Sequence, residues 1–88
     1  SSAASDVYKR QRNIRTFAAH LHGKNSYDQE SYTGGTAFLI GNEGKGLTDE
    51  AADSADCLIR IPMCGKVESL NAAMASGILM YEAARQRR

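Results

Sequence analysis

The sequence predicts an α/β domain in which a mostly parallel sheet is flanked by helices. Three short apolar runs, each followed by a polar loop, are typical of strands, and they span residues 14–21, 36–40 and 57–61. Helix-forming stretches follow the loops after the second and third runs, so strands and helices alternate. The run 36–40 lacks regular polar alternation, which favours a parallel strand covered on both faces.

Length and charge restrict the classes of protein to which this chain can belong. Its 88 residues form at most one small domain, and a formal net charge of +1 supplies no basic footprint typical of a stand-alone nucleic-acid binder. Cys57 and Cys64 match no zinc spacing, so we expect no metal site. Because no apolar run approaches about 18 residues and no signal peptide is recognisable, we expect a soluble cytoplasmic protein without membrane contact.

The first part of the chain carries little chemistry. Residues 1–13 are interpreted as a leader that is frayed or non-native, and residues 14–88 as the structured unit. His20 and His22 end the first strand, and we interpret each as a structural or surface histidine. The polar stretch 22–33 is predicted to be a loop with one short helical turn.

The second strand is followed by a glycine-rich loop, residues 41–47 with the sequence GNEGKGL. Its glycine spacing is neither that of a dinucleotide-binding turn nor that of a phosphate loop. The loop supplies close backbone approach, an amide and a carboxylate, although a tight strand-to-helix turn would explain the same composition. Thr48 is a predicted N-cap for a helix over residues 49–55.

The third strand stops at Pro62, which has no N–H to donate to a sheet. Gly65 then permits a turn, and Ser69 is a predicted N-cap for a long helix over residues 70–88. Apolar residues three or four apart make one stripe that we expect to face the core: Leu70, Ala73, Met74, Gly77, Ile78 and Tyr81.

Both polar loops follow strands that we expect to be neighbours in a parallel sheet, whose carboxyl ends meet at one edge and commonly bind ligands there. The loops would bring together Glu43, Ser69 and Asn71, a carboxylate, a hydroxyl and an amide. Reading the residues alone therefore leads to a neutral, polar ligand pocket without a metal set or a histidine base.

Two motifs in these loops resemble a known enzyme family. Residues 42–47 (NEGKGL), then 61–71 (IPMCGKVESLN) and 77–82 (GILMYE), closely resemble the second and third signature motifs of the TrmH/SpoU branch of the SPOUT RNA methyltransferases. The resemblance covers roughly residues 14–88.

The resemblance implies an α/β-knot, here a partial trefoil domain, that binds S-adenosyl-L-methionine and works as a homodimer on structured rRNA or tRNA. It implies methyl transfer to a ribose 2′-hydroxyl. By position, the cofactor-binding residues would be Gly41, Asn42, Ile61 and Leu70, mainly through backbone atoms. The same correspondence implies that the active site is lined by Glu43, Ser69 and Asn71.

One family feature is absent from the sequence. The family's first motif carries an arginine that assists deprotonation of the 2′-hydroxyl, and the segment 12–15 (RNIR) lacks its context. We therefore expect residues 14–88 to be the C-terminal half of a methyltransferase domain, with a cofactor pocket but without activity alone. The alternative is a non-catalytic ligand-binding or dimerisation module on the same fold.

Overall fold

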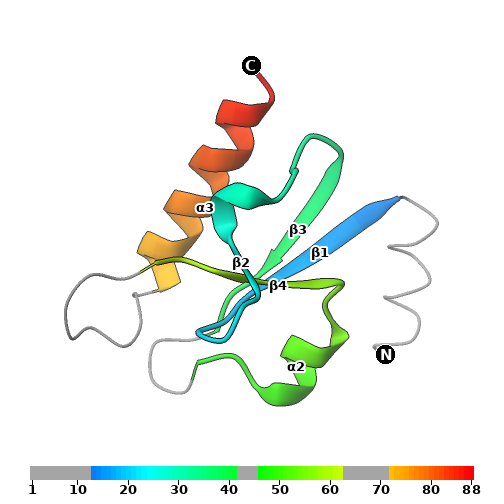
Figure 1. Cartoon of the computed structure of the whole chain (residues 1–88), viewed down its shortest axis with the longest axis vertical. Coiled ribbons are helices and arrows are strands. Elements are labelled where there is room, and N and C mark those ends of the chain that lie inside the picture. The colour runs from blue at the N-terminus through cyan, green and yellow to red at the C-terminus, as the bar shows by residue number, and fades with distance from the viewer. Residues whose placement is uncertain (1–12, 42–45, 63–71) are drawn as a thin grey trace.

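A computed structural model describes residues 13–41, 46–62 and 72–88 (Figure 1). Its elements, in chain order, are β1 (Ile14–Ala19), β2 (Asn25–Ser26), the 3-10 turn η1 (Tyr27–Gln29), β3 (Gly35–Leu39), α2 (Asp49–Ser54), β4 (Cys57–Arg60) and α3 (Ala72–Gln86). Within these segments, no helix is both long enough and apolar enough to cross a membrane.

The strands form one four-stranded parallel sheet in the order β2-β4-β1-β3. This confirms the predicted α/β class and its three main strands. The strand β2 was not predicted, because its two polar residues, Asn25 and Ser26, have no strand pattern and become a strand only by pairing with Ile59 and Arg60. The predicted short helical turn in the same stretch is η1. The trefoil knot is not traced by the described segments and stays a prediction.

The centre of the fold is a cluster of four fully buried side chains, Phe17, Tyr32, Ile59 and Leu79. They bring together β1, β4, α3 and the loop before β3. The Tyr32 ring meets Phe17 edge-on at a centroid distance of 4.9 Å, an arrangement that aromatic pairs favour. Burial, with a smaller effect of the Glu30 charge, raises the pKa of the Tyr32 hydroxyl, which donates a hydrogen bond to the Tyr27 carbonyl.

The face of α3 that packs on the sheet differs from the predicted one. Its buried residues are Ala75, Leu79 and Glu82, whereas Met74 is 59% exposed and Tyr81 69% exposed. The predicted apolar stripe was therefore wrong for the described part of the helix. Small and apolar residues occur on several sides of this helix, so helical spacing alone could not identify the side that packs.

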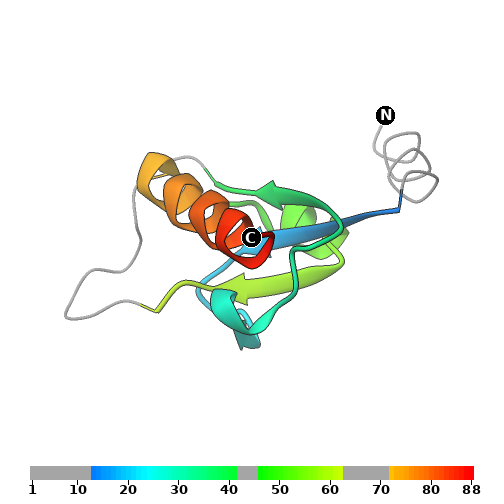
Figure 2. The same ribbon diagram turned by 90° about the horizontal axis from the view of Figure 1, so that it is seen from above.

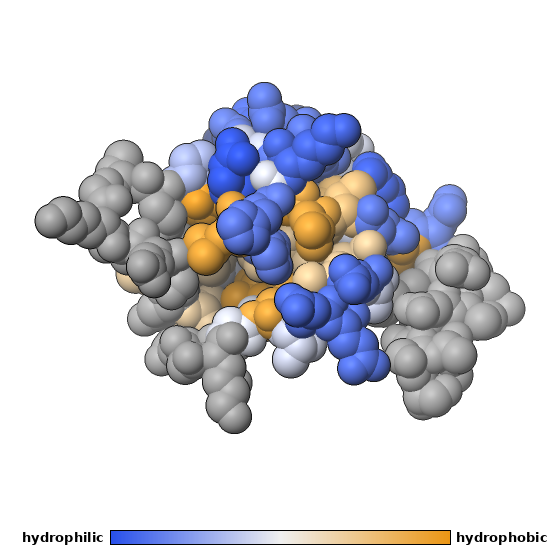
Figure 3. Space-filling view, turned by 60° about the horizontal axis from the view of Figure 1, so that its bottom comes forward, coloured by the Kyte–Doolittle hydropathy of each residue, from blue (hydrophilic) through white to orange (hydrophobic). Residues whose placement is uncertain are grey.

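The strand β3 is also less covered than predicted. Residues 36–40 are half-buried at every position, and β3 lies at an edge of the described sheet. The strand covered on both faces is β1, whose Thr16, Phe17 and Ala18 are all buried. Figure 3 brings the bottom of Figure 1 forward. It shows apolar side chains exposed to solvent in the middle of this side of the molecule.

The short helix α2 confirms the predicted cap at Thr48. The Ala51 backbone N–H donates to Thr48 Oγ1 over 3.1 Å, and Asp49 and Glu50 lie in the first turn, where carboxylates complement the helix dipole. Asp56 then ties the start of β4 to β1, because its Oδ2 accepts hydrogen bonds from the N–H and hydroxyl of Thr16, at 2.8 and 3.0 Å.

The end of α3 holds the loop before β3 through side-chain hydrogen bonds to its backbone. Gln86 accepts from the Tyr32 N–H at 2.7 Å and donates to the Glu30 carbonyl at 2.9 Å. Arg87 donates to the carbonyls of Tyr32 and Gly34, at 2.9 and 2.8 Å. Figures 1 and 2 show α3 running beside η1 and this loop. Residues more than 50 positions apart are thereby fixed to each other.

Glu82 gives the contact between α3 and the loop before β3 a predictable pH dependence, because it accepts a hydrogen bond from Gln86. Hydrogen bonds from Arg85 and Gln86 lower the pKa of the Glu82 carboxyl from 4.5 to about 2. A carboxyl whose pKa is depressed by folding stabilises the fold above its unfolded pKa and loses that contribution as pH falls through its folded pKa. The stabilisation is thus expected to disappear between about pH 4.5 and pH 2.

We expect Glu82→Gln to lower the thermal midpoint at pH 7 and to shrink the difference between the midpoints at pH 7 and pH 2.5. Circular dichroism melts at both pH values measure this. Asp53→Asn, at an exposed position on α2, serves as the control and should show the wild-type difference. An unchanged difference in Glu82→Gln would contradict the predicted role of the carboxylate.

Candidate functional site

The ends of β3 and β4 lie on either side of β1, at the same edge of the sheet. Ala18 of β1 is in register with Leu39 of β3 and with Leu58 of β4. Gly41 and Ile61 therefore extend beyond the sheet at nearly the same level, about two strand spacings or 10 Å apart. Figure 1 shows the three long strands ending toward the side of the molecule where α3 begins. The structure thus brings together two of the predicted cofactor-binding residues.

The backbone of Gly41 packs directly against Gly46 and Leu47. A Cβ at position 41 would lie 2.1 Å from the Leu47 nitrogen and 2.2 Å from the Gly46 carbonyl carbon, distances that no side chain tolerates. Gly46 itself has a φ of +68°, a conformation that glycine adopts without strain. Two glycines of the loop therefore have a structural role, which the loop's composition had left open.

Ile61 leaves β4 with its side chain packed against the buried core cluster, and Pro62 after it is exposed. With the Ile61 side chain directed to the core, its backbone groups are the part of the residue suited to contact a ligand. Proline ends the ladder here because it has no N–H to donate.

The other predicted site residues lie outside the described segments. They are Asn42 and Glu43 in the first loop and Ser69, Leu70 and Asn71 in the second. Their proposed roles stay predictions, as does the cap at Ser69.

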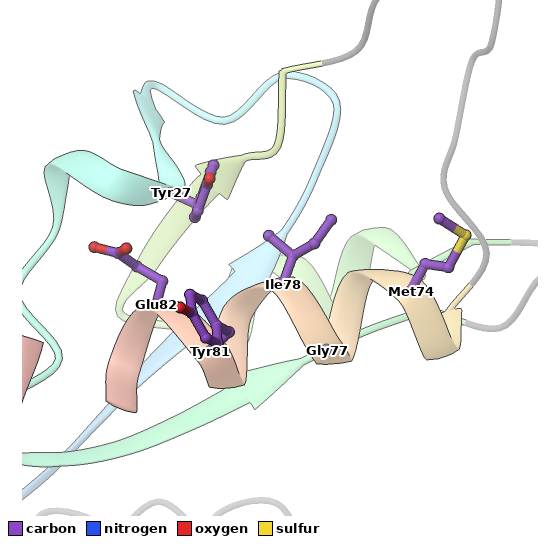
Figure 4. Close-up of a pocket in the computed structure, with 6 residues that line it drawn as sticks. All are labelled: Tyr27, Met74, Gly77, Ile78, Tyr81 and Glu82. Carbon is purple, nitrogen blue, oxygen red and sulfur yellow. The ribbon is translucent and has the colours of Figure 1, made fainter. Parts of the chain in front are cut away.

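An open groove of about 500 Å³, which was not predicted from the sequence, runs along α3. Tyr27 of η1 faces the helix across it, and the rest of the lining comes from Met74, Gly77, Ile78, Tyr81 and Glu82 (Figure 4). None of the predicted site residues lines it. The sequence does contain a signal for this groove. Four residues of the apolar stripe that was predicted to face the core, Met74, Gly77, Ile78 and Tyr81, line the groove instead.

Residues 2–81 match the profile of the SpoU rRNA Methylase family. An uncharacterized tRNA/rRNA methyltransferase of Mycolicibacterium smegmatis is 44% identical over 66 residues, which cover 75% of this chain and 21% of that protein. The 23S rRNA (guanosine-2′-O-)-methyltransferase RlmB of Pseudomonas syringae is 44% identical over 59 residues, 67% of this chain and 24% of that protein.

Among solved structures, the SpoU methyltransferase AviRb of Streptomyces viridochromogenes, in complex with the cofactor AdoMet, superimposes with a TM-score of 0.86. The match is 34% identical in sequence and covers 99% of this chain and 35% of AviRb. The chain spans about a fifth of the length of the curated relatives it matches.

Proposed function

We propose that this chain, which belongs to the SpoU rRNA Methylase family, is the cofactor-binding part of an S-adenosyl-L-methionine-dependent RNA ribose 2′-O-methyltransferase of the cytoplasm. The observation that carries the proposal is the common register of β3 and β4 on either side of β1. It supports a single ligand site between Gly41 and Ile61, at the edge where open parallel sheets bind ligands. The cofactor-bound AviRb, with which this chain superimposes, further supports that choice of ligand.

The described residues fit a nucleoside-containing cofactor through their backbones. Gly41 offers no side chain, and the Ile61 side chain is engaged with the core, so both can recognise a ligand only through peptide N–H and C=O groups. In the proposal, Asn42 and Leu70 complete this cradle. Peptide groups held by a rigid sheet edge orient a ligand at little entropic cost, which is the main way positioning accelerates a displacement.

The bound cofactor supplies an activated methyl group. In the proposal, Glu43, Ser69 and Asn71 line the space next to it and hold the ribose hydroxyl of the RNA by hydrogen bonds. A 2′-hydroxyl is a very weak acid, so it also needs a group that accepts its proton. The family's first-motif arginine assists this step, and we propose that the segment described here positions the reactants without it.

Calorimetric titration of S-adenosyl-L-methionine into this chain tests the cofactor site, with ATP as the control ligand. We expect saturable binding of the methionine cofactor and none of ATP, because the described residues at its centre, Gly41 and Ile61, bring no cationic side chain to bind a triphosphate. Equal binding of both ligands, or of neither by a sample shown to be folded, would overturn the claim that this chain builds the site.

The catalytic assignment is tested in the protein that contains this chain, with rRNA and labelled cofactor. We expect Asn71→Ala to reduce methylation at least tenfold, while Asp53→Ala, exposed on α2, leaves it unchanged. Wild-type methylation by Asn71→Ala would favour the alternative of a non-catalytic ligand-binding module.

We further propose that the protein is a homodimer that uses the groove side of α3. The groove side of α3 carries an apolar strip, in which the largely exposed Tyr81 lies beside the partly buried Ile78, with Met74 toward the start of the helix. Gly77 lies within this strip, and no heavy atom would lie within 4 Å of a Cβ added there. A glycine at that place lets a second helix approach closely.

We expect Gly77→Leu to weaken dimerisation at least tenfold without unfolding the monomer. Gly34→Leu, at an exposed glycine before β3 where an added Cβ also has no heavy atom within 4 Å, adds the same side chain away from α3 and should leave the dimer intact. Sedimentation equilibrium at several concentrations measures both. A wild-type chain that is monomeric at all concentrations, or a Gly77→Leu dimer of unchanged affinity, would contradict the proposed interface.

A further inference from the structure

The turn that follows β1 has a defined shape and stands next to the proposed cofactor edge. The His20 N–H donates to the Ile59 carbonyl at 2.9 Å, which continues the sheet by one residue, and the Gly23 N–H then donates back to the His20 carbonyl at 3.0 Å. Gly23 is buried so closely against β4 that a Cβ would lie 2.5 Å from the Ile59 carbonyl carbon. The turn 20–23 is therefore rigid.

This turn belongs to the central strand of the three that end at the site. Because Ala18 is in register with Leu39 and Leu58, His20 stands at the level of Gly41 on one side and Arg60 on the other. The turn therefore lies beside the edge at which a ligand held between Gly41 and Ile61 would meet a large substrate.

The two imidazoles of the turn are held in a fixed relation. The His22 backbone N–H donates to His20 Nδ1 at 3.1 Å, which sets the orientation of the His20 ring. The two ring centroids are 5.5 Å apart at an interplanar angle of 47°. His22 is exposed, and Leu21 between them is 58% exposed. A buried core explains none of this exposed aromatic and apolar surface.

The charged residues that the turn itself carries or contacts, Lys24 and Arg60, are cationic. Residues 20–24 contain no carboxylate and end in the exposed Lys24. Arg60 lies under the turn and donates to the Gly23 carbonyl at 3.1 Å. Flat rings for stacking, with cations beside them for phosphate, are what single-stranded nucleic acid requires of a protein surface.

We propose that the turn 20–23 is an RNA contact in which the His22 ring, supported by His20 and Leu21, stacks on a base of the substrate next to the nucleotide being methylated. The inference rests on the proposed methyltransferase function, but its ligand is the RNA and not the cofactor. Lys24 and Arg60 would then lie along the phosphates that flank the stacked base.

The test measures binding of a fluorescein-labelled 12-nucleotide oligoadenylate by anisotropy, with an abasic oligomer of the same length as the control probe. Loss of one base-stacking contact weakens binding by about five- to a hundredfold, so we expect His22→Ala to lose at least fivefold for the oligoadenylate. His22→Phe should retain most of the affinity, since it keeps a flat ring. Met80→Ala, at a position 67% exposed on α3, should bind like the wild type.

His20→Asn provides a second arm, because its amide oxygen can still accept the His22 N–H while the rest of the ring is removed. We expect it to weaken oligoadenylate binding less than His22→Ala does. Nuclear magnetic resonance supplies a readout that a merely structural role would not move: the His22 ring protons should shift upfield when the oligoadenylate is added.

Three results would overturn the proposal: wild-type oligoadenylate binding by His22→Ala, an equal loss for the abasic oligomer, or an equal loss of S-adenosyl-L-methionine affinity. The second would assign the turn to phosphate binding and the third to the cofactor adenine. Because cofactor titration is measured separately, failure of the proposed function appears as absent cofactor binding in the wild type, whereas failure of this inference leaves that binding intact.

Discussion

Replacing Gly23 by alanine is expected to destabilise the fold by about 3 kcal/mol or more, at the upper end of what overpacking costs. The added Cβ would lie 2.5 Å from the Ile59 carbonyl carbon, 2.7 Å from the Arg60 nitrogen and 2.8 Å from the Ile59 oxygen. All three atoms are backbone, so no side-chain rotation can relieve the contact.

The backbone of β4 is unable to move away because it is held on both sides. Ile59 is in register with Asn25 of β2 and with Ala19 of β1, and its carbonyl accepts the His20 N–H. Any displacement that accommodates the methyl group breaks hydrogen bonds of one or both neighbouring strands. The expected cost therefore exceeds that of a glycine substitution in an ordinary surface turn.

Urea denaturation followed by circular dichroism measures the effect. The matched control is Gly34→Ala, since Gly34 is exposed and a Cβ there would have no heavy atom within 4 Å. We expect the control to unfold within about 0.5 kcal/mol of the wild type, as surface substitutions commonly do. Equal stability of the two variants would mean that the turn 20–23 is free to move, and would also weaken the inference that it presents its histidines rigidly.

The parts of this fold that the sequence predicted are those in which local chemistry determines structure. Thr48 caps α2 because a side-chain oxygen can accept from the first turn of a helix wherever that helix lies. Pro62 ends β4 because it has no N–H to donate. Such features depend on residues a few positions apart, so they can be predicted from the sequence without knowledge of the fold.

The parts that the sequence did not predict depend on partners distant in the chain. β2 exists only because Asn25 and Ser26 meet β4, which follows them by more than 30 residues. The buried side of α3 is set by Phe17 and Ile59, and the burial of Glu82 by its hydrogen bonds to Arg85 and Gln86. A carboxylate is an unexpected residue on a packed helix face. A search for apolar residues at helical spacing therefore selected the other side of α3 as the buried one.

The candidate site was predictable in its position but not in its detail. The edge of the sheet followed from parallel strands with polar loops, and the register of β1 with β3 and β4 places Gly41 and Ile61 at that edge. The two strands were wrongly predicted to be neighbours, because β1 lies between them. His20 and His22 were interpreted as structural or surface residues, because nothing in the sequence indicates that the strand they end is the central one. That fact comes from the order of the strands.

Leu79→Ala is expected to cost about 2–5 kcal/mol, the range for removing a fully buried leucine side chain from a core. Leu79 is 0% exposed and is the only residue of α3 in the central cluster, where it meets Phe17, Tyr32 and Ile59. Domains of this size are stable by roughly 0.05–0.15 kcal/mol per residue. The loss would thus remove a large share of the total free energy of unfolding.

The neighbouring position supplies the control. Met80 is similar in size and adjacent in the same helix, but 67% exposed, so Met80→Ala should change the free energy of unfolding by less than about 0.5 kcal/mol. Denaturant titrations of both variants measure the contrast. Equal losses would mean that α3 sits in a different rotation about its axis, closer to the one predicted from the apolar stripe.

The rotation of α3 about its axis also determines which side chains are exposed on the surface of the molecule. If Leu79 faces the core, Gly77 and Tyr81 are directed outward, as the proposed dimer requires. If the stripe faced the core instead, the groove beside Tyr27 would close and Gln86 could not reach the backbone of Glu30 and Tyr32. The same pair of variants therefore tests the helix face on which the dimer proposal depends, independently of any measurement of association.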